Sequence, residues 1–224
     1  MNPEKYSVII SVDGSSTVID SAHNEHFHST FGALTESLYI FINNGFKEVV
    51  KPNIRILEVG FGTGLNCILT IINKEHEQKV LYHSIEKYPL PFNVTNELNY
   101  HSLLNISPEI IKSLHAFKWD IEAEFSENFI LKKLNVDLID FIPESKYDVV
   151  YFDAFSYNIQ PELWSSDIFI KMFNCLSPGG LLVTYSAKGE VKKALRTAGF
   201  VVKRIKGPPG KRHILQAHIP QINK

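Results

Sequence analysis

Short apolar runs alternate with helix-like segments between about residue 54 and residue 200, and this alternation constrains the fold most strongly. The apolar runs are rich in β-branched and aromatic residues, as strands are, whereas the segments between them have helical periodicity. We predict strands at 54–59, 80–86, 129–137, 147–155 and 180–186, and helices at 65–73, 107–117 and 189–200. This order is typical of an α/β fold built on a parallel sheet.

The end of the chain departs from the parallel pattern. Two further strand-like runs, 200–206 and 212–219, are separated only by Gly-Pro-Pro-Gly-Lys. A parallel crossover needs a dozen or more residues, so these runs predict an antiparallel hairpin. A mostly parallel sheet that ends in such a hairpin favours the seven-stranded, Rossmann-like class I methyltransferase fold over an NAD-binding Rossmann domain.

The region before residue 51 does not follow the alternation. It holds a strand-like segment at 6–14 and a helical segment at 33–45. We expect residues 1–50 to form a small elaboration packed on a domain spanning residues 51–224, with both parts making one folded unit. The 224 residues, 44% of them hydrophobic, suffice for one full core.

Several classes of protein are disfavoured by composition. There is no run of about 18 apolar residues, and the first ten residues lack the layout of a signal peptide. We therefore expect a soluble, cytoplasmic protein without a membrane partner, whose oligomeric state the sequence does not predict. Cys67 and Cys175 lie in apolar segments and predict no disulfide. The histidines at 23–28 come from one segment, whereas metal ligands usually converge from several, so no metal is predicted.

A net charge of -1 conceals a basic segment near the end of the chain. Residues 1–187 carry 13 Lys/Arg against 23 Asp/Glu, whereas residues 188–212 carry 9 against 1. Clustered basic residues on a nearly neutral chain indicate either a phosphate-binding surface or a solvated helix followed by a charged hairpin. Charge alone does not separate these two readings.

The sequence Glu-Val-Gly-Phe-Gly-Thr-Gly-Leu-Asn at 58–66 places three glycines between a predicted strand and a predicted helix. No lysine follows Gly64, which disfavours a P-loop, and Leu65 stands where a dinucleotide fingerprint has its third glycine. Glycines at 60, 62 and 64 allow a ligand to approach the backbone closely. An acidic residue, Glu58, precedes them by two positions.

Acidic residues also follow three predicted strands. Glu86, Asp137 and Asp153 end the strands at 80–86, 129–137 and 147–155. Ligands of open α/β sheets bind beyond the carboxyl ends of the strands, so these carboxylates are expected at one site. Glu86 can accept hydrogen bonds from ribose hydroxyls, whereas Asp137 can contact an adenine amino group or cap a following helix.

The ordered set of motifs resembles a known family. Residues 58–66, 151–169, 176–200 and 206–217 together are similar to the methyltransferase half of the MnmC-type tRNA 5-methylaminomethyl-2-thiouridine biosynthesis proteins, and residues 25–41 resemble the segment before the glycine motif. The similarity spans about residues 20–218. It implies S-adenosylmethionine-dependent N-methylation of 5-aminomethyl-(2-thio)uridine at the tRNA wobble position.

The resemblance also implies which groups are bound. S-adenosylmethionine (SAM) is the expected cofactor and S-adenosylhomocysteine its product, with no metal ion. The bifunctional members carry an FAD-dependent oxidase domain, for which this chain is too short, so no FAD is expected. The cofactor-binding residues implied are Glu58, Gly60, Phe61, Gly62, Thr63, Gly64, Asn66, Glu86, Asp137 and Asp153.

The methyl acceptor and the tRNA have their own implied residues. Asp153 is expected to orient the substrate amine, with its proton passing to solvent or a relay, and Glu36 to face the amine or the SAM ammonium group. Phe155 and Trp164 are expected to stack on the uracil or to form a wall of the pocket. The residues expected to meet phosphates of the tRNA anticodon region are Lys188, Lys192, Lys193, Lys211 and Arg212.

Three alternatives remain open from the sequence. Aminopropyltransferases of the spermidine synthase type share the layout, but they usually have Gly-Gly-Gly-Asp-Gly where this chain has Gly-Phe-Gly-Thr-Gly. A methyltransferase that acts on a protein or another small amine is the second alternative. A non-catalytic RNA-binding module is the third, and it would have no competent SAM pocket.

Overall fold

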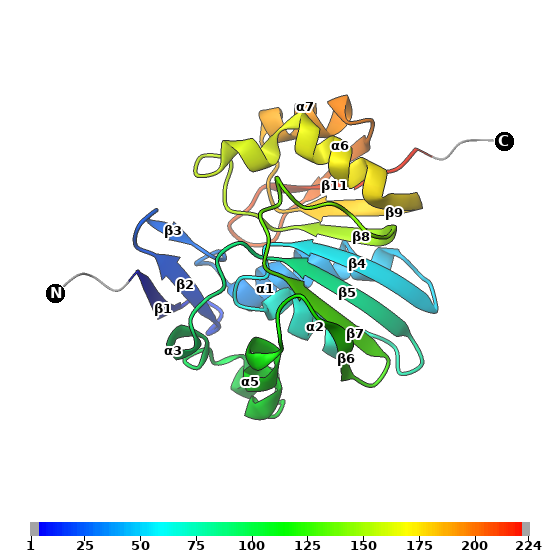
Figure 1. Cartoon of the computed structure of the whole chain (residues 1–224). Helices are drawn as coiled ribbons and strands as arrows, with labels where there is room; N and C mark the ends of the chain where they lie inside the picture. The colour runs from blue at the N-terminus through cyan, green and yellow to red at the C-terminus, as the bar shows by residue number, and fades with distance from the viewer. Residues whose placement is uncertain (1–4, 221–224) are drawn as a thin grey trace.

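The computed structural model describes residues 5–220, which form one mixed sheet with helices on both faces and a small second sheet beyond the carboxyl ends of its central strands (Figure 1). The main sheet has the order β10-β11-β9-β8-β4-β5-β7-β6. Its strands are β4 (Asn53–Val59), β5 (Lys79–Ile85), β6 (Glu122–Ser126), β7 (Phe129–Leu134), β8 (Tyr147–Phe152), β9 (Leu176–Thr184), β10 (Val201–Lys206) and β11 (His213–His218).

The predicted strand directions are confirmed. Strands β7, β5, β4, β8 and β9 are parallel to one another. Strands β10 and β11 form the expected antiparallel hairpin, and β11 also pairs antiparallel with β9. The expectation of seven strands is corrected to eight, because β6 adds an antiparallel strand to the edge at β7. This strand is short and largely exposed, so its sequence lacks the apolar alternation by which a strand can be predicted.

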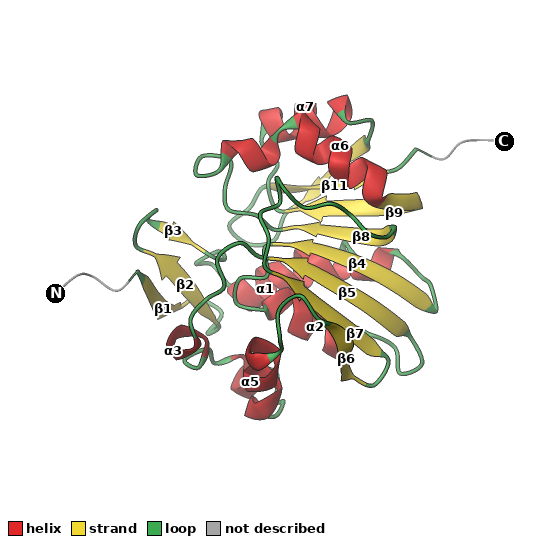
Figure 2. Ribbon diagram, in the orientation of Figure 1, coloured by secondary structure: helices red, strands yellow, loops and turns green. Residues whose placement is uncertain are grey.

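Helices cover both faces of the sheet (Figure 2). The sheet lies between two layers of the hydrophobic core, one on each face. One layer includes side chains of α2 (Leu65–Asn73) and α5 (Pro108–Ala116), both predicted. The other lies under α7 (Gly189–Thr197), also predicted, and α6 (Ser166–Cys175), which the sequence reading missed. The short helices are α3 (Phe92–Thr95), α4 (Tyr100–Leu103) and a 3₁₀ turn at Pro161–Trp164.

The helix starts follow from local chemistry. Ser107 caps α5 by accepting a hydrogen bond from the Glu109 amide at 3.3 Å, and Pro108 occupies the first helical position, where a missing amide costs nothing. Helix α6 begins in the same way, since the hydroxyl of Ser165 accepts from the Ile168 amide at 3.4 Å. Helix α7 ends before Gly199, which has a left-handed φ of 103°.

The N-terminal region forms an antiparallel sheet of β1 (Tyr6–Ile10), β2 (Ser16–Asp20) and β3 (Glu25–His26). Helix α1 (Ala33–Ser37) follows and continues into a π-helical segment, Leu38–Asn43, and a 3₁₀ turn, Phe46–Glu48. Val18 and Phe41 from this region belong to the same core layer as Ile56 and Ile68. Packing therefore joins the N-terminal sheet to the main sheet.

A polar contact also joins the N-terminal sheet to the glycine loop. The Tyr100 hydroxyl lies 3.0 Å from the Ser16 carbonyl oxygen and 2.9 Å from the Thr63 hydroxyl. Nearby, the side-chain oxygen of Asn99 accepts from the Ser16 amide at 2.8 Å.

Within residues 5–220, no helix is both long and apolar enough to cross a bilayer.

Candidate active site

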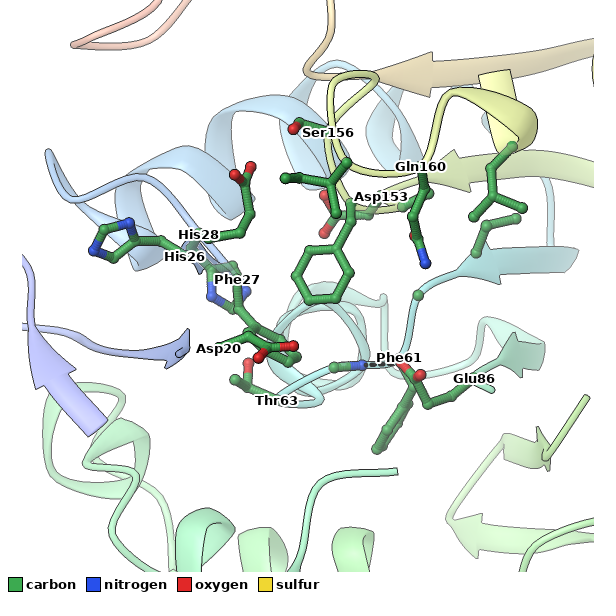
Figure 3. Close-up of a pocket in the computed structure, with 18 of the residues that line it drawn as sticks. Asp20, His26, Phe27, His28, Phe61, Thr63, Glu86, Asp153, Ser156 and Gln160 are labelled. Carbon is green, nitrogen blue, oxygen red and sulfur yellow. Dashed lines mark hydrogen bonds between the residues drawn. The ribbon is translucent and has the colours of Figure 1, made fainter. Parts of the chain in front are cut away.

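A pocket of about 820 Å³ lies beyond the carboxyl ends of β4, β5, β8 and β9 (Figure 3). Residues that follow these strands line its floor, as the fold predicts for an open α/β sheet. Residues 25–31 of the N-terminal region and residues 210–211 of the hairpin turn line it from above. Its volume is within the range of small-molecule sites, about 300–1,000 Å³.

The glycine loop after β4 has a backbone that only glycine accommodates easily. Gly60 has a φ of 90°, and a Cβ atom there would lie 2.6 Å from the carbonyl oxygen of Asp153. The ends of β4 and β8 meet at this point, where the Asp153 amide donates to the Val59 carbonyl oxygen at 3.0 Å. Gly60, Phe61, Gly62 and Thr63 line the pocket, whereas Gly64 does not.

Glu86 follows β5, as predicted, and faces the pocket across from the loop (Figure 3). One carboxylate oxygen accepts from the Gly62 amide at 3.1 Å, and the other accepts from the Tyr88 amide at 2.8 Å. Burial raises the pKa of Glu86 above its ordinary value, while these amide donors oppose the rise. The remaining lone pairs of a carboxylate held in this way can accept hydrogen bonds from a pair of ligand hydroxyls.

Asp137 also lines the pocket, three residues after the end of β7. One carboxylate oxygen accepts from the Ile139 amide at 2.9 Å and the other from the Lys87 ammonium group at 2.6 Å. Burial acts to raise the pKa of Asp137, but the bonds from Lys87 and Ile139 outweigh it and the pKa is lowered. Residues 138–140 form a turn, so Asp137 caps no helix.

Glu58 does not line the pocket, which corrects the expectation that it contacts the cofactor. The side chain is fully buried beneath the loop, where it accepts a hydrogen bond from the Ser84 hydroxyl at 2.5 Å. Burial raises its pKa to about 8, so the group is mostly protonated at neutral pH. Glu58 therefore connects the ends of β4 and β5 beneath the loop.

Asp153 follows β8 at the centre of the pocket floor. One carboxylate oxygen accepts from the side-chain amide of Asn66, at the start of α2, at 2.8 Å. Burial raises the pKa of Asp153 to about 7, and the nearby Glu36 carboxylate acts in the same direction. The Asn66 hydrogen bond and the Lys211 charge oppose this rise. Asp153 therefore titrates in the neutral range.

Glu36 and Lys211 face each other within the pocket. Glu36 belongs to α1, and one of its oxygens accepts from the Ser29 amide at 3.1 Å. The other lies 2.9 Å from the Lys211 ammonium group, which also sits 4.9 Å above the ring of Tyr185. Lys211 thus points into the pocket, whereas the sequence reading placed it against tRNA phosphates.

The two aromatic residues predicted to contact substrate have different positions. Phe155 lines the pocket and meets the ring of Phe27 edge-on, with 4.9 Å between centroids. Trp164 is only 1% exposed and does not line the pocket, which corrects its predicted contact with the substrate. Its indole N–H donates to the Phe155 carbonyl oxygen at 2.8 Å, so Trp164 supports the strand-end segment from behind.

The remaining predicted tRNA-binding residues lie outside the pocket. Lys188 precedes α7 and donates to the side-chain oxygen of Asn158 at 2.6 Å. Ser156 and Gln160, on the same loop as Asn158, line the pocket, so the basic segment begins beside its rim. Lys192 and Lys193 follow on α7, and Arg212 is exposed in the hairpin turn; the structure tests none of these contacts.

Other pocket residues were missed by the sequence reading. Phe27 and Tyr185 lie within the family-like segments 25–41 and 176–200, but no role was predicted for either, and only the structure shows that both line the pocket. His28, one of the histidines at 23–28, also lines the pocket. Burial lowers the pKa of His28 to about 4, so its ring is neutral.

Among residues 5–220, no group of three His, Cys, Asp or Glu side chains is arranged to hold a metal ion.

A buried lysine supports the glycine loop from below. Lys133 has no exposed surface, and its ammonium group donates to the carbonyl oxygens of Leu114 and His115 at 2.8 and 3.0 Å. His115 in turn donates from its ring to the Thr63 carbonyl oxygen at 3.1 Å. His115 therefore connects the end of α5 to the glycine loop, and Lys133 of β7 holds that end of the helix.

Replacing Lys133 by methionine is expected to lower the free energy of unfolding by about 1–3 kcal/mol, because two buried carbonyl oxygens lose their donor. Urea denaturation measures this change. Lys112→Met is the control, since Lys112 is 47% exposed and pairs with the 70% exposed Glu109, and such pairs contribute about 0–1 kcal/mol. A larger loss in the control than in Lys133→Met would contradict the role given to Lys133.

The pocket suits a cationic ligand that carries a diol. Its strand-end carboxylates, Glu86 and Asp153, and the Glu36 carboxylate face one space. Carboxylates stabilise a nearby positive charge, and the anchored Glu86 has free acceptor positions for hydroxyl groups. Both properties fit the sulfonium, ammonium and ribose groups of SAM, the ligand implied by the glycine motif.

Comparisons with known proteins agree with this geometry. A family model described as S-adenosyl-L-methionine-dependent methyltransferase matches residues 100–220. The tRNA 5-methylaminomethyl-2-thiouridine biosynthesis bifunctional protein MnmC of Pseudoalteromonas atlantica is 28% identical over 92% of this chain and 32% of its own length. That of Burkholderia multivorans is 26% identical over 89% and 33%. The chain thus spans about a third of these curated relatives.

A solved structure is similar over almost the whole chain. The crystal structure of MNMC2 from Aquifex aeolicus matches with a TM-score of 0.75 and 29% sequence identity, covering 98% of this chain and 72% of that one. Methyltransferase SibL, in its apo form, has a TM-score of 0.50 at 15% identity, a likeness that concerns the fold alone.

Proposed function

Because the chain belongs to the S-adenosyl-L-methionine-dependent methyltransferase family and has its class I fold, we propose that it methylates the amine of 5-aminomethyl-(2-thio)uridine at the tRNA wobble position. The product is 5-methylaminomethyl-(2-thio)uridine. The observation that carries the proposal is the Asp153 carboxylate at the pocket floor, held by Asn66 and faced by Glu36. The similarity to the MnmC proteins supports tRNA as the substrate, and a tRNA substrate implies a cytoplasmic protein.

The cofactor is held by the part of the pocket that the glycine loop, Glu86 and Asp137 form. Glu86 binds its ribose hydroxyls, Asp137 its adenine amino group, and the backbone at 60–63 and Asn66 approach its remaining parts. When bound, SAM supplies a methyl group activated by its sulfonium charge. Neither a metal ion nor FAD has a role in this proposal.

The chain's own residues position the acceptor amine and remove its proton. Glu36 and Asp153 orient the amine, and holding reactants in near-attack geometry can supply about 7–11 kcal/mol of the barrier. A general base works best with a pKa near the operating pH, and burial raises the pKa of Asp153 to about 7. Asp153 therefore accepts the proton that the nitrogen loses as the methyl group is transferred, a role that the sequence analysis gave to solvent or a relay. Phe155 and Phe27 form an aromatic wall against which the uracil ring packs.

Phosphates of the anticodon region bind along the basic segment that begins at the pocket rim. Lys188 stands at the rim, and Lys192 and Lys193 extend the positive surface along α7. Arg212 adds a charge in the hairpin turn. These contacts position the tRNA without reading its sequence.

The double replacement of Lys192 and Lys193 by alanine is expected to weaken tRNA binding and to flatten its salt dependence. Each lost phosphate contact reduces the slope of log K against log salt concentration by about 0.7–0.9. Filter binding at several salt concentrations measures the slope. Lys79→Ala, at the opposite end of β5, is the control. A slope equal to that of the wild type would rule out phosphate contacts at α7.

The proposed reaction is tested by incubating the protein with isotopically labelled SAM and tRNA from cells that lack the final methyltransferase. Mass spectrometry of the nucleosides should show label in 5-methylaminomethyl-2-thiouridine. Label in a different molecule would indicate another acceptor, and transfer of an aminopropyl group from decarboxylated SAM would indicate an aminopropyltransferase. Calorimetry that detects no SAM binding would favour the RNA-binding module.

A further inference from the structure

The hairpin turn between β10 and β11 holds Lys211 in a defined position. The Gly207 amide donates to the Arg212 carbonyl oxygen at 3.1 Å, and the Lys211 amide donates to the Pro208 carbonyl oxygen at 3.0 Å. Gly210 has a φ of 82°, and a Cβ atom there would lie 2.4 Å from the ring of Phe31. Close packing on Phe31 therefore directs the turn toward the pocket.

The Lys211 ammonium group connects three elements inside the pocket. It lies 2.9 Å from the Glu36 carboxylate of α1 and 4.9 Å above the ring of Tyr185, which follows β9. The Tyr185 hydroxyl donates to the Ala154 carbonyl oxygen at 2.9 Å, beside Asp153. The Lys211 side chain is 25% exposed and lines the pocket.

A cation at this position opposes the binding of a second cation. The ligands proposed above include a sulfonium group and an amine that is mostly protonated in water, and like charges repel. Such a residue is unfavourable for a pocket that only has to hold cations. It is useful when the reaction requires the amine in its neutral form, because a neighbouring ammonium group disfavours protonation of the amine.

We propose that Lys211 sets the charge state of the methyl-acceptor site: its ammonium group, held beside the Glu36 side chain, shifts the incoming primary amine from its ammonium form to its neutral form. The inference rests on the proposed function and deepens it. On binding, the amine releases one proton to solvent; its nitrogen then forms a bond to the methyl carbon as the bond from carbon to sulfur breaks, and the Asp153 carboxylate accepts a proton from the methylated nitrogen. Lys211 is a positioning residue in this step.

The other charged and titratable groups near the amine site are consistent with this role. Glu36 raises and Lys211 lowers the pKa of Asp153, while burial dominates both. Glu58 lies beneath the floor with a pKa raised by burial to about 8. Burial raises the pKa of Tyr185 far above neutrality, helped by Asp153, Glu25 and Glu36, so its ring stays uncharged. Lys211 thus supplies the positive charge that acts on Asp153.

The first test compares Lys211→Met and Lys211→Arg with the wild type over pH 6–10, with saturating SAM and the tRNA substrate. In Lys211→Met, kcat at pH 7 should fall at least tenfold and recover toward the wild-type value at high pH, where solvent deprotonates the amine. Lys211→Arg should retain most activity. The affinity for tRNA should stay within twofold of the wild type, and Lys79→Met, which changes a lysine outside the pocket, should behave as the wild type.

The second test measures protons without turnover. Calorimetry of 5-aminomethyluridine binding to the complex with S-adenosylhomocysteine, in two buffers of different ionisation enthalpy, counts the protons released. At pH 7 the wild type should release close to one proton per amine, and Lys211→Met substantially fewer. This difference in proton release can be observed even if the wild type does not methylate tRNA. Failure to methylate tRNA would contradict only the proposal that tRNA is the substrate.

Three results would overturn the role of Lys211. One is an equal loss of kcat at every pH in Lys211→Met, which a merely structural role produces. Another is a loss of tRNA affinity with an unchanged pH profile, which a phosphate contact produces. The third is equal proton release by the wild type and Lys211→Met.

Discussion

Replacing Asp153 by asparagine is expected to lower kcat by about 10²–10⁴-fold, the range typical of a lost general base. Asparagine preserves the volume, and its side-chain oxygen can still accept the hydrogen bond from Asn66 that holds Asp153 at 2.8 Å. The variant loses the negative charge that orients the amine and the group that accepts its proton. Single-turnover kinetics with preformed SAM complex measures the chemical step directly.

The same residue predicts the pH dependence of the wild type. Burial raises the pKa of Asp153 to about 7, so the carboxyl group is protonated below this pH and ionised above it. Because only the ionised form accepts a proton, kcat/KM should decrease as the pH falls below about 7. Asp153→Asn should lose this decrease together with most of its activity.

Asp140→Asn is the control for these measurements, since Asp140 is exposed and does not line the pocket. Calorimetry with SAM should show that Asp153→Asn still binds the cofactor and that the fold is intact. Turnover near the wild-type rate, with cofactor affinity unchanged, would show that Asp153 neither orients the amine nor takes its proton.

Replacing Gly60 by alanine is expected to lower the free energy of unfolding by about 2–4 kcal/mol and to weaken SAM binding more than tenfold. The added Cβ would lie 2.6 Å from the Asp153 carbonyl oxygen, a backbone atom, at a φ of 90° that alanine rarely adopts. The ends of β4 and β8 must then separate. This separation moves the glycine loop and Asp153, which together form the pocket floor.

Urea denaturation and calorimetry with SAM measure the two effects of Gly60→Ala. Gly189→Ala is a matched control, because Gly189 begins α7 and a Cβ atom there meets no other atom within 4 Å. That control should retain or slightly gain stability, since alanine restricts the unfolded chain more than glycine does. Equal stability of Gly60→Ala and the wild type would show that the strand ends tolerate the clash.

The alternation of apolar runs with helix-like segments predicted most of the main sheet because buried parallel strands are largely apolar, as residues 149–152 of β8 are. Strand β6 was missed because an exposed edge strand of five residues has no such run. The predicted positions of Glu86 and Asp153 agree with the structure for a physical reason. Parallel strands end at the same edge of a sheet, so residues that follow them converge whatever their separation along the chain.

Residue type alone did not predict the direction of a side chain. Trp164 and Glu58 have the chemistry of a binding residue, but packing turned both away from the pocket. Lys211 has the chemistry of a phosphate contact, and the turn that packs on Phe31 directs it to Glu36 instead. These outcomes depend on neighbours that are distant in sequence.

The α/β order, the glycine loop and the carboxylates at the strand ends could be predicted from the amino-acid sequence, because they follow from local periodicity and from the polarity of a parallel sheet. Which charges share the pocket depends on how distant segments pack in the folded protein. Glu36 comes from the N-terminal region and Lys211 from the C-terminal hairpin, and their ion pair exists because both segments pack over the same strand ends.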